Sequence, residues 1–368
     1  MLNLQPRGAA SAFWRWGSPV LALALTALIS GGIFACMGRP PLLTVYTFLV
    51  SPLFATGGLD ALAVKAAPLI MMAVGLSIAY RANVWNIGTE GQFTLGAIAA
   101  GGLALALPDM SGWVLFPALM AAGVLGGALY ALVVALLRTR FNASEILTSL
   151  MLTYVAQYVL IYLVTGPWRD PEGFGFPQTA MFSDAADGPR LVDGGNLHLG
   201  LLLAPAIAFV AWLAMGRTVL GFQLRVLGQA PRAARFAGFS EEKLIWLAMG
   251  ISGGLAGLAG MFEVTGTQGQ LTTNISPGYG FAAIIVAFLG RLSPAGVVPA
   301  GLLLALSYLG GDAAQMTLGM SNAITGIFQG ILLFCLLGAD VLILNRPVWR
   351  ARRAPSVAAR GAPREART

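Results

Sequence analysis

Charged side chains are scarce in this sequence, which has 368 residues of which only 10% are charged and 57% are hydrophobic. Soluble domains usually carry about 25% charged residues, because a water-exposed surface has to be covered with polar groups. The apolar excess extends along the whole chain, and the mean hydropathy is +0.77. These features exclude an ordinary soluble protein and indicate a chain whose main solvent is lipid.

Lysine, histidine and cysteine are almost absent. The two lysines, Lys65 and Lys243, precede alanine and leucine, so neither fits the Lys-Ser/Thr step of a P-loop ATPase. The single histidine, His198, and the two cysteines, Cys36 and Cys335, have no spacing typical of a zinc site or a cysteine protease. The sequence therefore predicts no catalytic residues, no metal site and no ATPase site of its own, and we interpret both cysteines as small buried apolar residues.

Long apolar runs recur along the chain, each of roughly 15–25 residues and long enough to cross a bilayer if some are tilted or broken. We expect about ten transmembrane helices, and hence an all-α polytopic membrane protein. The expected spans are 18–37, 60–80, 86–107, 113–137, 144–165, 198–216, 244–263, 278–290, 294–310 and 322–344. Segment 41–56 is apolar but short and contains Pro52, and we expect it to be an interfacial or re-entrant piece on the outer side.

The basic residues test this topology. If the N-terminus lies inside and the chain crosses ten times, only Arg39, Lys65, Arg169 and Arg190 of the 22 Lys and Arg residues fall outside or near the outer ends, which leaves 18 inside. Cytoplasmic loops of membrane proteins carry such an excess of Lys and Arg. We therefore expect both termini in the cytoplasm and the protein in the bacterial cytoplasmic (inner) membrane.

The segments between the spans complete the expected organisation. Residues 1–345 form a single transmembrane domain, with an acidic extracytoplasmic loop at 166–197 and a basic cytoplasmic loop at 217–243. The tail 346–368 is rich in Arg, Ala and Pro without an apolar period, so we expect it to be disordered and to lie near anionic lipid. Five spans in each half would give the halves opposite orientation, as in inverted repeats.

Polar residues are dense at 80–96, just before a glycine-rich apolar run. A polar start to a span leaves backbone N–H groups free at a positive helix end, and polar residues within spans often line a transport path. The two open interpretations are a broken helix that lines a path and an ordinary capped helix start. The path candidates here are Asn83, Asn86, Glu90, Gln92 and Thr94.

A second polar group follows at 141–154, where Glu145 lies a few residues into a span and Thr148 is three residues further on. A carboxylate at this depth is expected to face protein or water, so Glu145 and Thr148 are further path candidates. The alternative is a helix-start carboxylate stabilised by the helix dipole. Further polar candidates are Glu263, Gln268, Gln270 and Asn274, before the short apolar run at 278–290; for the last three, a position in a loop is the open alternative.

The stretch GQAPRAARFAG at 228–238 lies in the basic loop. Pro231 is suited to the first turn of a short helix and Gly238 to its end. Such a helix either docks a partner or lies on lipid headgroups.

Together these stretches resemble the permease subunit of bacterial ABC importers in the simple-sugar and branched-chain amino-acid permease superfamily, over roughly residues 60–345. The NIGTEGQ run at 86–92 is the most specific mark, and GPWRDPEGFGFPQT at 166–179 looks like the nucleoside (guanosine-type) uptake permeases. The resemblance implies a type II-like importer permease that forms the translocation path for nucleosides, related purines or simple sugars. One departure is Thr153, where relatives often carry Asn.

The resemblance also implies the partners and the coupling residues. The partners are an ABC ATPase subunit that hydrolyses ATP, a second related permease chain, and an extracytoplasmic substrate-binding lipoprotein; membrane lipid surrounds the chain, which binds no cofactor and no nucleic acid. The residues that contact the ATPase would be Gly228, Pro231, Arg232, Ala234, Arg235 and Gly238. The alternative is an ion-coupled secondary transporter of a small polar solute, in which Glu90 or Glu145 would titrate.

Overall fold

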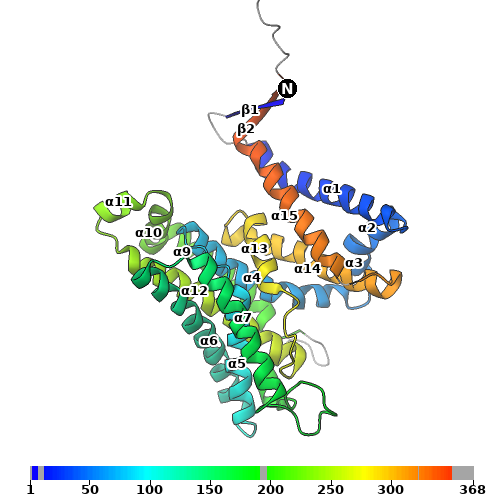
Figure 1. Ribbon diagram of the computed structural model, residues 1–368, viewed down its shortest axis with the longest axis vertical. Coiled ribbons are helices and arrows are strands. Elements are labelled where there is room, and N and C mark those ends of the chain that lie inside the picture. Colours follow the sequence, from blue (N-terminus) through cyan, green and yellow to red (C-terminus); the bar gives the residue numbers. More distant parts are fainter. Residues whose placement is uncertain (1, 7–11, 191–196, 322, 350–368) are drawn as a thin grey trace, which may run out of the picture.

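The computed structural model describes residues 2–6, 12–190, 197–321 and 323–349, and these are mostly helical (Figure 1). The first half contains α1 (Ala12–Cys36), α2 (Pro41–Leu49), α3 (Ser51–Phe54), α4 (Gly58–Arg81), α5 (Thr89–Ala106), α6 (Gly112–Phe141), α7 (Glu145–Thr165) and α8 (Asp184–Asp187). The second contains α9 (Gly200–Arg217), α10 (Val219–Gln229), α11 (Pro231–Phe236), α12 (Glu241–Phe262), the π-helical turn η1 (Glu263–Gln268), α13 (Tyr279–Leu289), α14 (Pro294–Leu318) and α15 (Ala323–Leu344). Two strands, β1 (Leu2–Pro6) and β2 (Asn345–Trp349), complete the order.

Each expected span overlaps one helix. Seven helices in the described parts of the chain are long and apolar enough to cross a bilayer. Helix α5 is not among them, and α13 and the Ala323–Ala339 part of α15 are shorter apolar helices. The predicted all-α polytopic membrane fold is confirmed, and the number of crossings stays a prediction. The 11 residues of α13 extend only about 16 Å at the helical rise of 1.5 Å per residue, so α13 cannot cross the hydrocarbon alone.

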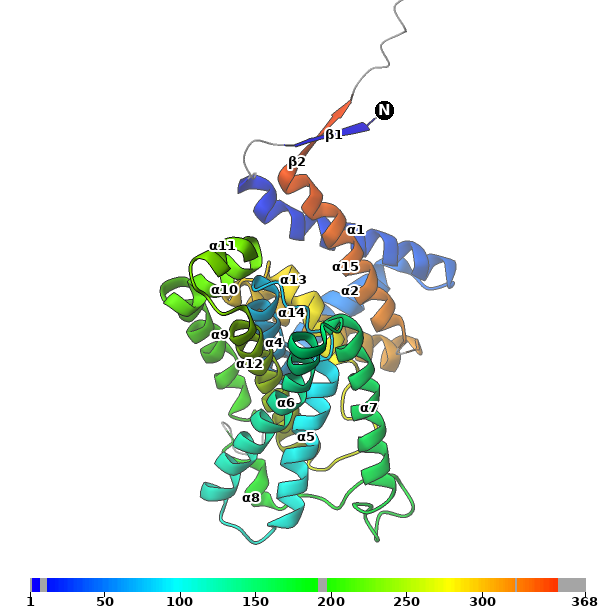
Figure 2. The same cartoon turned by 60° about the vertical axis from the view of Figure 1, so that its left-hand side comes forward.

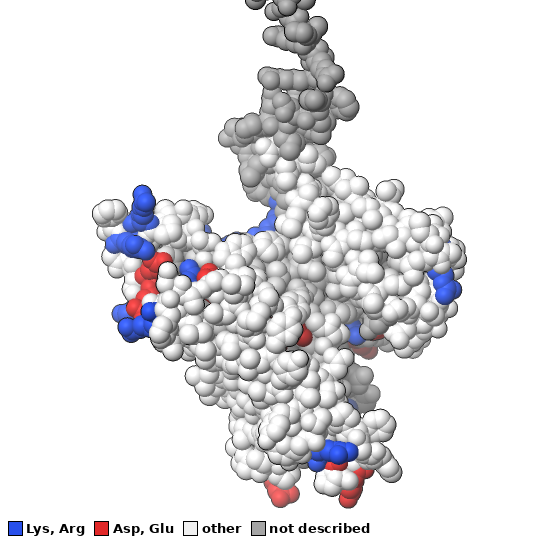
Figure 3. Space-filling view, viewed as in Figure 1, with Lys and Arg blue, Asp and Glu red and all other residues white. Residues whose placement is uncertain are grey.

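Polar and apolar surfaces separate along the molecule. Figure 2 shows α10 and α11 at one end and α8 with its loops at the other, and we call these the α11 end and the α8 end. On the face in Figure 3, Lys and Arg gather over the α11 end, acidic residues also appear at the α8 end, and a nearly uncharged band lies between them. The expected loops 166–197 and 217–243 therefore lie, in their described parts, at opposite ends of the helical bundle.

Helix α12 is the centre of the packing and contacts α4, α5 and α6. Glycines permit this closeness: a Cβ on Gly257 would lie 2.1 Å from the Gly123 carbonyl oxygen, and one on Gly96 would lie 2.2 Å from the Gly257 Cα. Small residues of this kind let helix backbones approach closely in membranes, where packing rather than water exclusion drives association. The result is a closely packed core of α4, α5, α6 and α12.

The chain ends meet in a ribbon that we had not predicted. β1 and β2 pair antiparallel, with Leu2 opposite Trp349 and Pro6 opposite Asn345. The cause is tertiary, because α1 and α15 pack on each other and bring the two chain ends together beyond them (Figure 1). Most of the expected disordered tail, residues 350–368, lies outside the described residues.

The segment 41–56 forms two helices, α2 and α3, that connect α1 to α4 and pack on α14. Phe48 is 1% exposed and its ring stacks between Phe34 and Phe328, with centroid distances of 5.7 and 5.4 Å. Cys335 is buried as expected, but the expectation for Cys36 is wrong because it is exposed at the last residue of α1. Small apolar residues tolerate a lipid-facing position, so hydrophobic character alone did not decide burial.

The contacts bear on the expected repeat. In the expected repeat, α4, α5 and α6 correspond to α12, α13 and α14. The contact of α6 with α12 then corresponds to that of α14 with α4, and the contact of α5 with α12 corresponds to that of α13 with α4. The first helices break this correspondence, since α9 contacts α4 whereas α1 contacts α15 and α2 instead. The expected inverted repeat of two five-span halves therefore stays a prediction.

Candidate functional site

The polar start of α5 is a buried junction between helices. Asn86 and Gln92 are 0% and 1% exposed and exchange two hydrogen bonds: Asn86 Nδ2 donates to Gln92 Oε1 at 2.8 Å, and Gln92 Nε2 donates to Asn86 Oδ1 at 2.9 Å. Asn86 Nδ2 also donates to Ser252 Oγ of α12 at 2.9 Å, and the Gly88 N–H donates to Asn86 Oδ1. Every hydrogen-bonding atom of the Asn86 amide is therefore used inside the protein.

Two glycines of this segment hold α5 against α7. A Cβ on Gly88 would lie 2.7 Å from the Ser149 carbonyl oxygen, and one on Gly91 would lie 2.8 Å from the Thr153 Cα. Thr153, the position of the departure from the resembling family, is 7% exposed and its hydroxyl donates to the Ser149 carbonyl at 3.1 Å. Thr153 thus faces α5 in this conformation.

Glu90 connects the starts of two helices. Its carboxylate Oε2 accepts a hydrogen bond from the Gly280 N–H of α13 at 2.5 Å, and the Glu90 side chain is 8% exposed. The N–H groups in the first turn of a helix have no partner within that helix, and a carboxylate there also interacts favourably with the helix dipole. Ser276 Oγ accepts from the Tyr279 N–H at 2.9 Å, so the α13 start is capped by two separate segments.

Charged residues within the spans form a further cluster. Lys65 of α4 and Asp312 of α14 form an ion pair of 3.1 Å, and Glu263 begins η1 with 7% exposure. Gln268 Nε2 donates to the Glu263 carboxylate at 3.3 Å and to the Ile275 carbonyl at 2.9 Å. Sequence reasoning missed the Lys65–Asp312 pair, because the two residues are far apart in the chain and only the α4–α14 packing joins them.

The remaining path candidates lie elsewhere. Thr94 lies one turn beyond Glu90 and donates to the Glu90 carbonyl at 2.9 Å. Asn83 is exposed in the α4–α5 turn, with a φ of 57°. Glu145 pairs with Arg138 at 2.8 Å, and Thr148 donates to the Ser144 carbonyl. The structure therefore brings Asn86, Gln92, Glu90 and Thr94 into one junction and leaves Glu145 and Thr148 separate, at the start of α7.

An exposed tyrosine row on α7 was also missed. Tyr154, Tyr158 and Tyr162 are 53%, 70% and 68% exposed, and their spacing of four places them along one side of the helix. Among the other helices, α7 contacts α5 and α6 and borders the bundle in Figure 2. A tyrosine hydroxyl prefers a polar partner when it leaves water. The four-residue spacing of the tyrosines was the sequence signal that could have indicated this row.

The expected coupling segment forms a projecting hairpin of α10 and α11 at the α11 end (Figure 1). Pro231 is the first residue of α11, and Gly238 follows its end with a φ of +78°. Ala234 is buried at 1% exposure, whereas Phe236 is 95% exposed. Arg232 is exposed, and Arg235 donates from Nε and Nη2 to one Glu241 oxygen at 3.0 and 2.7 Å.

Gly228 joins this hairpin to the core. A Cβ at Gly228 would lie 2.0 Å from the Arg81 carbonyl oxygen and 3.2 Å from the Ala82 carbonyl carbon. The end of α10 therefore rests directly on the end of α4, whose following turn leads into the Asn86 junction. A displacement of the hairpin would therefore be transmitted to α4 by direct backbone contact.

Comparison with known proteins agrees with these features. Residues 58–337 match the family described as "Branched-chain amino acid transport system / permease component". The glucose ABC transporter permease protein TsgB13 of Haloferax volcanii is 35% identical over 351 residues, which cover 92% of this chain and 91% of the relative. The nucleoside ABC transporter permease protein NupB of Lactococcus lactis is 25% identical, with 83% and 84% covered.

A third relative, the guanosine ABC transporter permease protein NupP of Bacillus subtilis, is 29% identical, with 72% of this chain and 77% of the relative covered. Family and relatives together span most of the helical bundle, including the junction at Asn86 and the α10–α11 hairpin. This multi-pass membrane chain belongs to the family of the branched-chain amino acid transport system permease component.

Proposed function

We propose that this chain is the permease subunit of an ABC importer that carries nucleosides, related purines or simple sugars across the cytoplasmic membrane. Its relatives are named as glucose, nucleoside and guanosine permeases, which supports a neutral polar substrate. The observation that carries the proposal is the α10–α11 hairpin, which projects from the bundle and rests on α4 through Gly228. The hairpin end faces the cytoplasm, and both termini lie on that side.

The proposed partner at the hairpin is an ABC ATPase subunit, which binds and hydrolyses ATP. Arg232 and Phe236 are exposed there and are available to a partner, whereas buried Ala234 and the Arg235–Glu241 contact keep α11 in place. Closure of two ATPase subunits would move both hairpins, and alternating access follows from rigid-body rocking of the helices.

The coupling assignment is tested in proteoliposomes that contain the complete importer. Gly228→Ala forces its Cβ against the Arg81 carbonyl, and Arg235→Ala removes the contact with Glu241. We expect both, together with Gly238→Ala, to lower substrate-stimulated ATP hydrolysis, while Arg217→Ala, an exposed basic residue at the end of α9, leaves it unchanged. Normal coupling in all three variants would reject the assignment.

We propose that substrate passes along the tyrosine row of α7, between this chain and a second related permease chain. Exposed tyrosines in mid-helix suit a hydrated, aromatic-lined path better than hydrocarbon, because the hydroxyls need polar partners. Thr148 and Glu145 precede the row on the same helix and are candidates for one mouth of the path. The satisfied Asn86–Gln92 pair, with Glu90 and Thr94, instead holds the helices that gate it.

The path is tested by comparing aromatic residues on two helices. Tyr158→Ala is expected to reduce uptake without changing the amount of complex purified, whereas Phe209→Ala, which removes an aromatic ring of similar 58% exposure on α9, is expected to have no effect. Equal uptake by both variants would remove α7 from the path.

The substrate and the remaining partners are tested together. We propose that an extracytoplasmic binding lipoprotein delivers the ligand and that the second permease chain is a different but related one. Radiolabelled guanosine and glucose, offered separately to the purified binding lipoprotein, should show which class binds. Transport by this chain alone in proteoliposomes, driven by an ion gradient, would instead establish a secondary transporter.

A further inference from the structure

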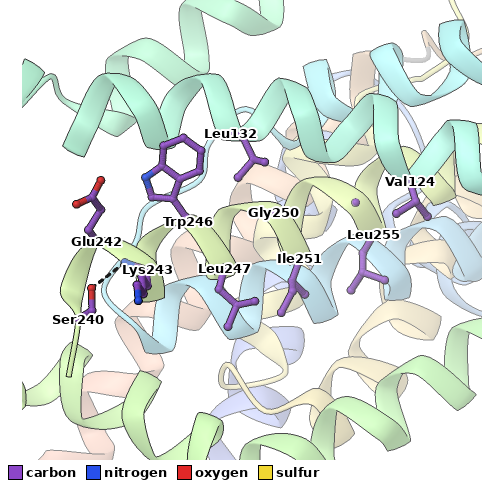
Figure 4. Close-up of a pocket in the computed structure, with 11 residues that line it drawn as sticks. Val124, Leu132, Ser240, Glu242, Lys243, Trp246, Leu247, Gly250, Ile251 and Leu255 are labelled. Atoms are coloured by element: carbon purple, nitrogen blue, oxygen red, sulfur yellow. Dashed lines mark hydrogen bonds between the residues drawn. The ribbon is translucent and has the colours of Figure 1, made fainter. Parts of the chain in front are cut away.

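A groove of about 880 Å³ lies between α6 and α12, and neither the transport path nor the coupling hairpin uses it. Figure 4 shows the residues that line it: Leu132 and Val124 belong to α6, and Leu247, Ile251 and Leu255 belong to α12. Gly250 and Gly254 contribute no side chain to the space between the walls. The walls formed by these residues are thus apolar.

Polar groups gather at one end of the groove only. Ser240, Glu242 and Lys243 lie together there (Figure 4), at the start of α12 and therefore at the α11 end. Glu242 is balanced by Arg140, at 3.8 Å, and no ion pair in the described chain includes Lys243. The mouth therefore carries a net positive charge.

The side chains at the mouth are suited to an anionic headgroup. Ser240 Oγ accepts from the Lys243 N–H at 3.4 Å, which leaves the hydroxyl hydrogen available for another acceptor. Trp246, one turn further in, donates its indole N–H to Thr139 Oγ1 at 3.1 Å, so its ring is held as a fixed apolar wall. Basic pockets between membrane helices on the cytoplasmic side bind anionic lipid headgroups.

The length of the groove decides between a lipid and a crossing helix. From Lys243 to Leu255 the helical rise of 1.5 Å per residue gives about 18 Å, close to half of the roughly 30 Å hydrocarbon core. A crossing helix of a partner would need an apolar face across both leaflets. A groove that is charged at one end and one leaflet long matches a single phospholipid.

We propose that the α6–α12 groove is a binding site for one anionic phospholipid of the leaflet at the α11 end. An acyl chain lies over Gly250 and Gly254 between the walls, and the headgroup phosphate accepts from Lys243 Nζ and the Ser240 hydroxyl. The site is separate from the transport function and is tested by binding alone.

The test is native mass spectrometry of the full-length protein after exchange from vesicles of phosphatidylglycerol and phosphatidylcholine into detergent. The wild type should retain one phosphatidylglycerol. Lys243→Gln should lower the preference for phosphatidylglycerol about fivefold, the factor expected for one cationic side chain at a lipid surface. Arg217→Gln, which removes a basic residue at the same end but outside the groove, should leave the preference unchanged.

A second variant tests the apolar part of the site. A Cβ at Gly250 would meet only Leu132 Cδ2, at 3.5 Å, so Gly250→Phe fills the groove without a backbone clash and should abolish retention of both lipids. The matched control is Gly216→Phe on α9, where nothing lies within 4 Å of an added Cβ. The proposal would be overturned if both groove variants retained phosphatidylglycerol as the wild type does. It would also be overturned if Gly250→Phe lost permease–permease association, because the groove would then be a protein interface.

Discussion

At the residue scale, the polar side chains that drew attention in the sequence prove to be structural partners of one another. Asn86 and Gln92 are six positions apart and form a closed amide pair within the core. Their residue types indicated a polar role, but only the tertiary structure places Ser252 of α12 within hydrogen-bond distance of Asn86. Buried amides are expensive unless their hydrogen bonds are complete.

The amide pair leads to a prediction on stability. Gln92→Leu removes both hydrogen bonds to Asn86 and leaves part of that buried amide unsatisfied, which costs about 1–3 kcal/mol. We expect a lower thermal unfolding midpoint of the purified protein in detergent. Gln315→Leu, an exposed position on α14, is the control, and equal midpoints for the two variants would contradict the role of the pair.

His198 gives a prediction on pH dependence. The imidazole is 4% exposed, its Nδ1 accepts from the Gly200 N–H at 3.2 Å, and its ring stacks on Phe262. Burial lowers the pKa of His198, and the charge of Asp187 opposes this only in part. The folded state therefore binds this proton less readily than the unfolded state does.

A lowered pKa in the folded state means that the contribution of His198 to stability is complete above the ordinary histidine pKa of about 6.5 and declines as the pH falls below it. The unfolding midpoint of the wild type should drop between pH 7 and pH 5. His198→Asn keeps a polar acceptor and cannot titrate, so its midpoint should depend less on pH. The same slope in both proteins would assign the effect to other groups.

At the element scale, two glycines of α12 differ in how closely the neighbouring helix approaches them. Gly250 and Gly257 lie two turns apart on the same helix, yet one borders the open groove and the other touches the backbone of α6. The sequence pattern of small residues predicted close packing in general. It did not distinguish the two positions, because the distinction depends on which neighbouring helix lies opposite.

This difference predicts opposite outcomes for the same substitution. Gly257→Ala places a methyl group 2.1 Å from the Gly123 carbonyl oxygen, which must separate α6 from α12 and costs about 1–3 kcal/mol or more. Gly250→Ala meets no atom closer than 3.5 Å and raises helix propensity. Thermal unfolding in detergent should show a loss for the first and no loss for the second; a comparable loss in both would contradict the packing.

The short helix α13 also depends on another element for its start. Glu90 and Ser276 cap its first N–H groups, so the α5 start and the α13 start form one unit. From the sequence we expected Glu90 to line a path and 278–290 to be a short span. The connection between them was beyond sequence reasoning because the two residues that meet are 190 positions apart.

At the scale of the whole molecule, the separation of the two polar ends predicts the result of labelling. The exposed Glu172 lies in the loop towards the α8 end and the exposed Ala237 in the hairpin at the α11 end. With Cys36 and Cys335 replaced by serine, Glu172→Cys should react with an impermeant maleimide added to intact cells, and Ala237→Cys only after lysis. The reverse pattern would remove the hairpin from reach of a cytoplasmic ATPase.

The sequence by itself determined that this is a helical membrane protein, where its apolar segments lie, and which family it resembles, because hydrophobic runs and local motifs are properties of contiguous residues. Only the tertiary structure decided that the ends pair as a ribbon, that the polar start of α5 is closed on itself, that Lys65 meets Asp312, and that a groove lies beside α12. These features depend on distances between residues far apart in the chain, which helix packing sets and no local pattern encodes.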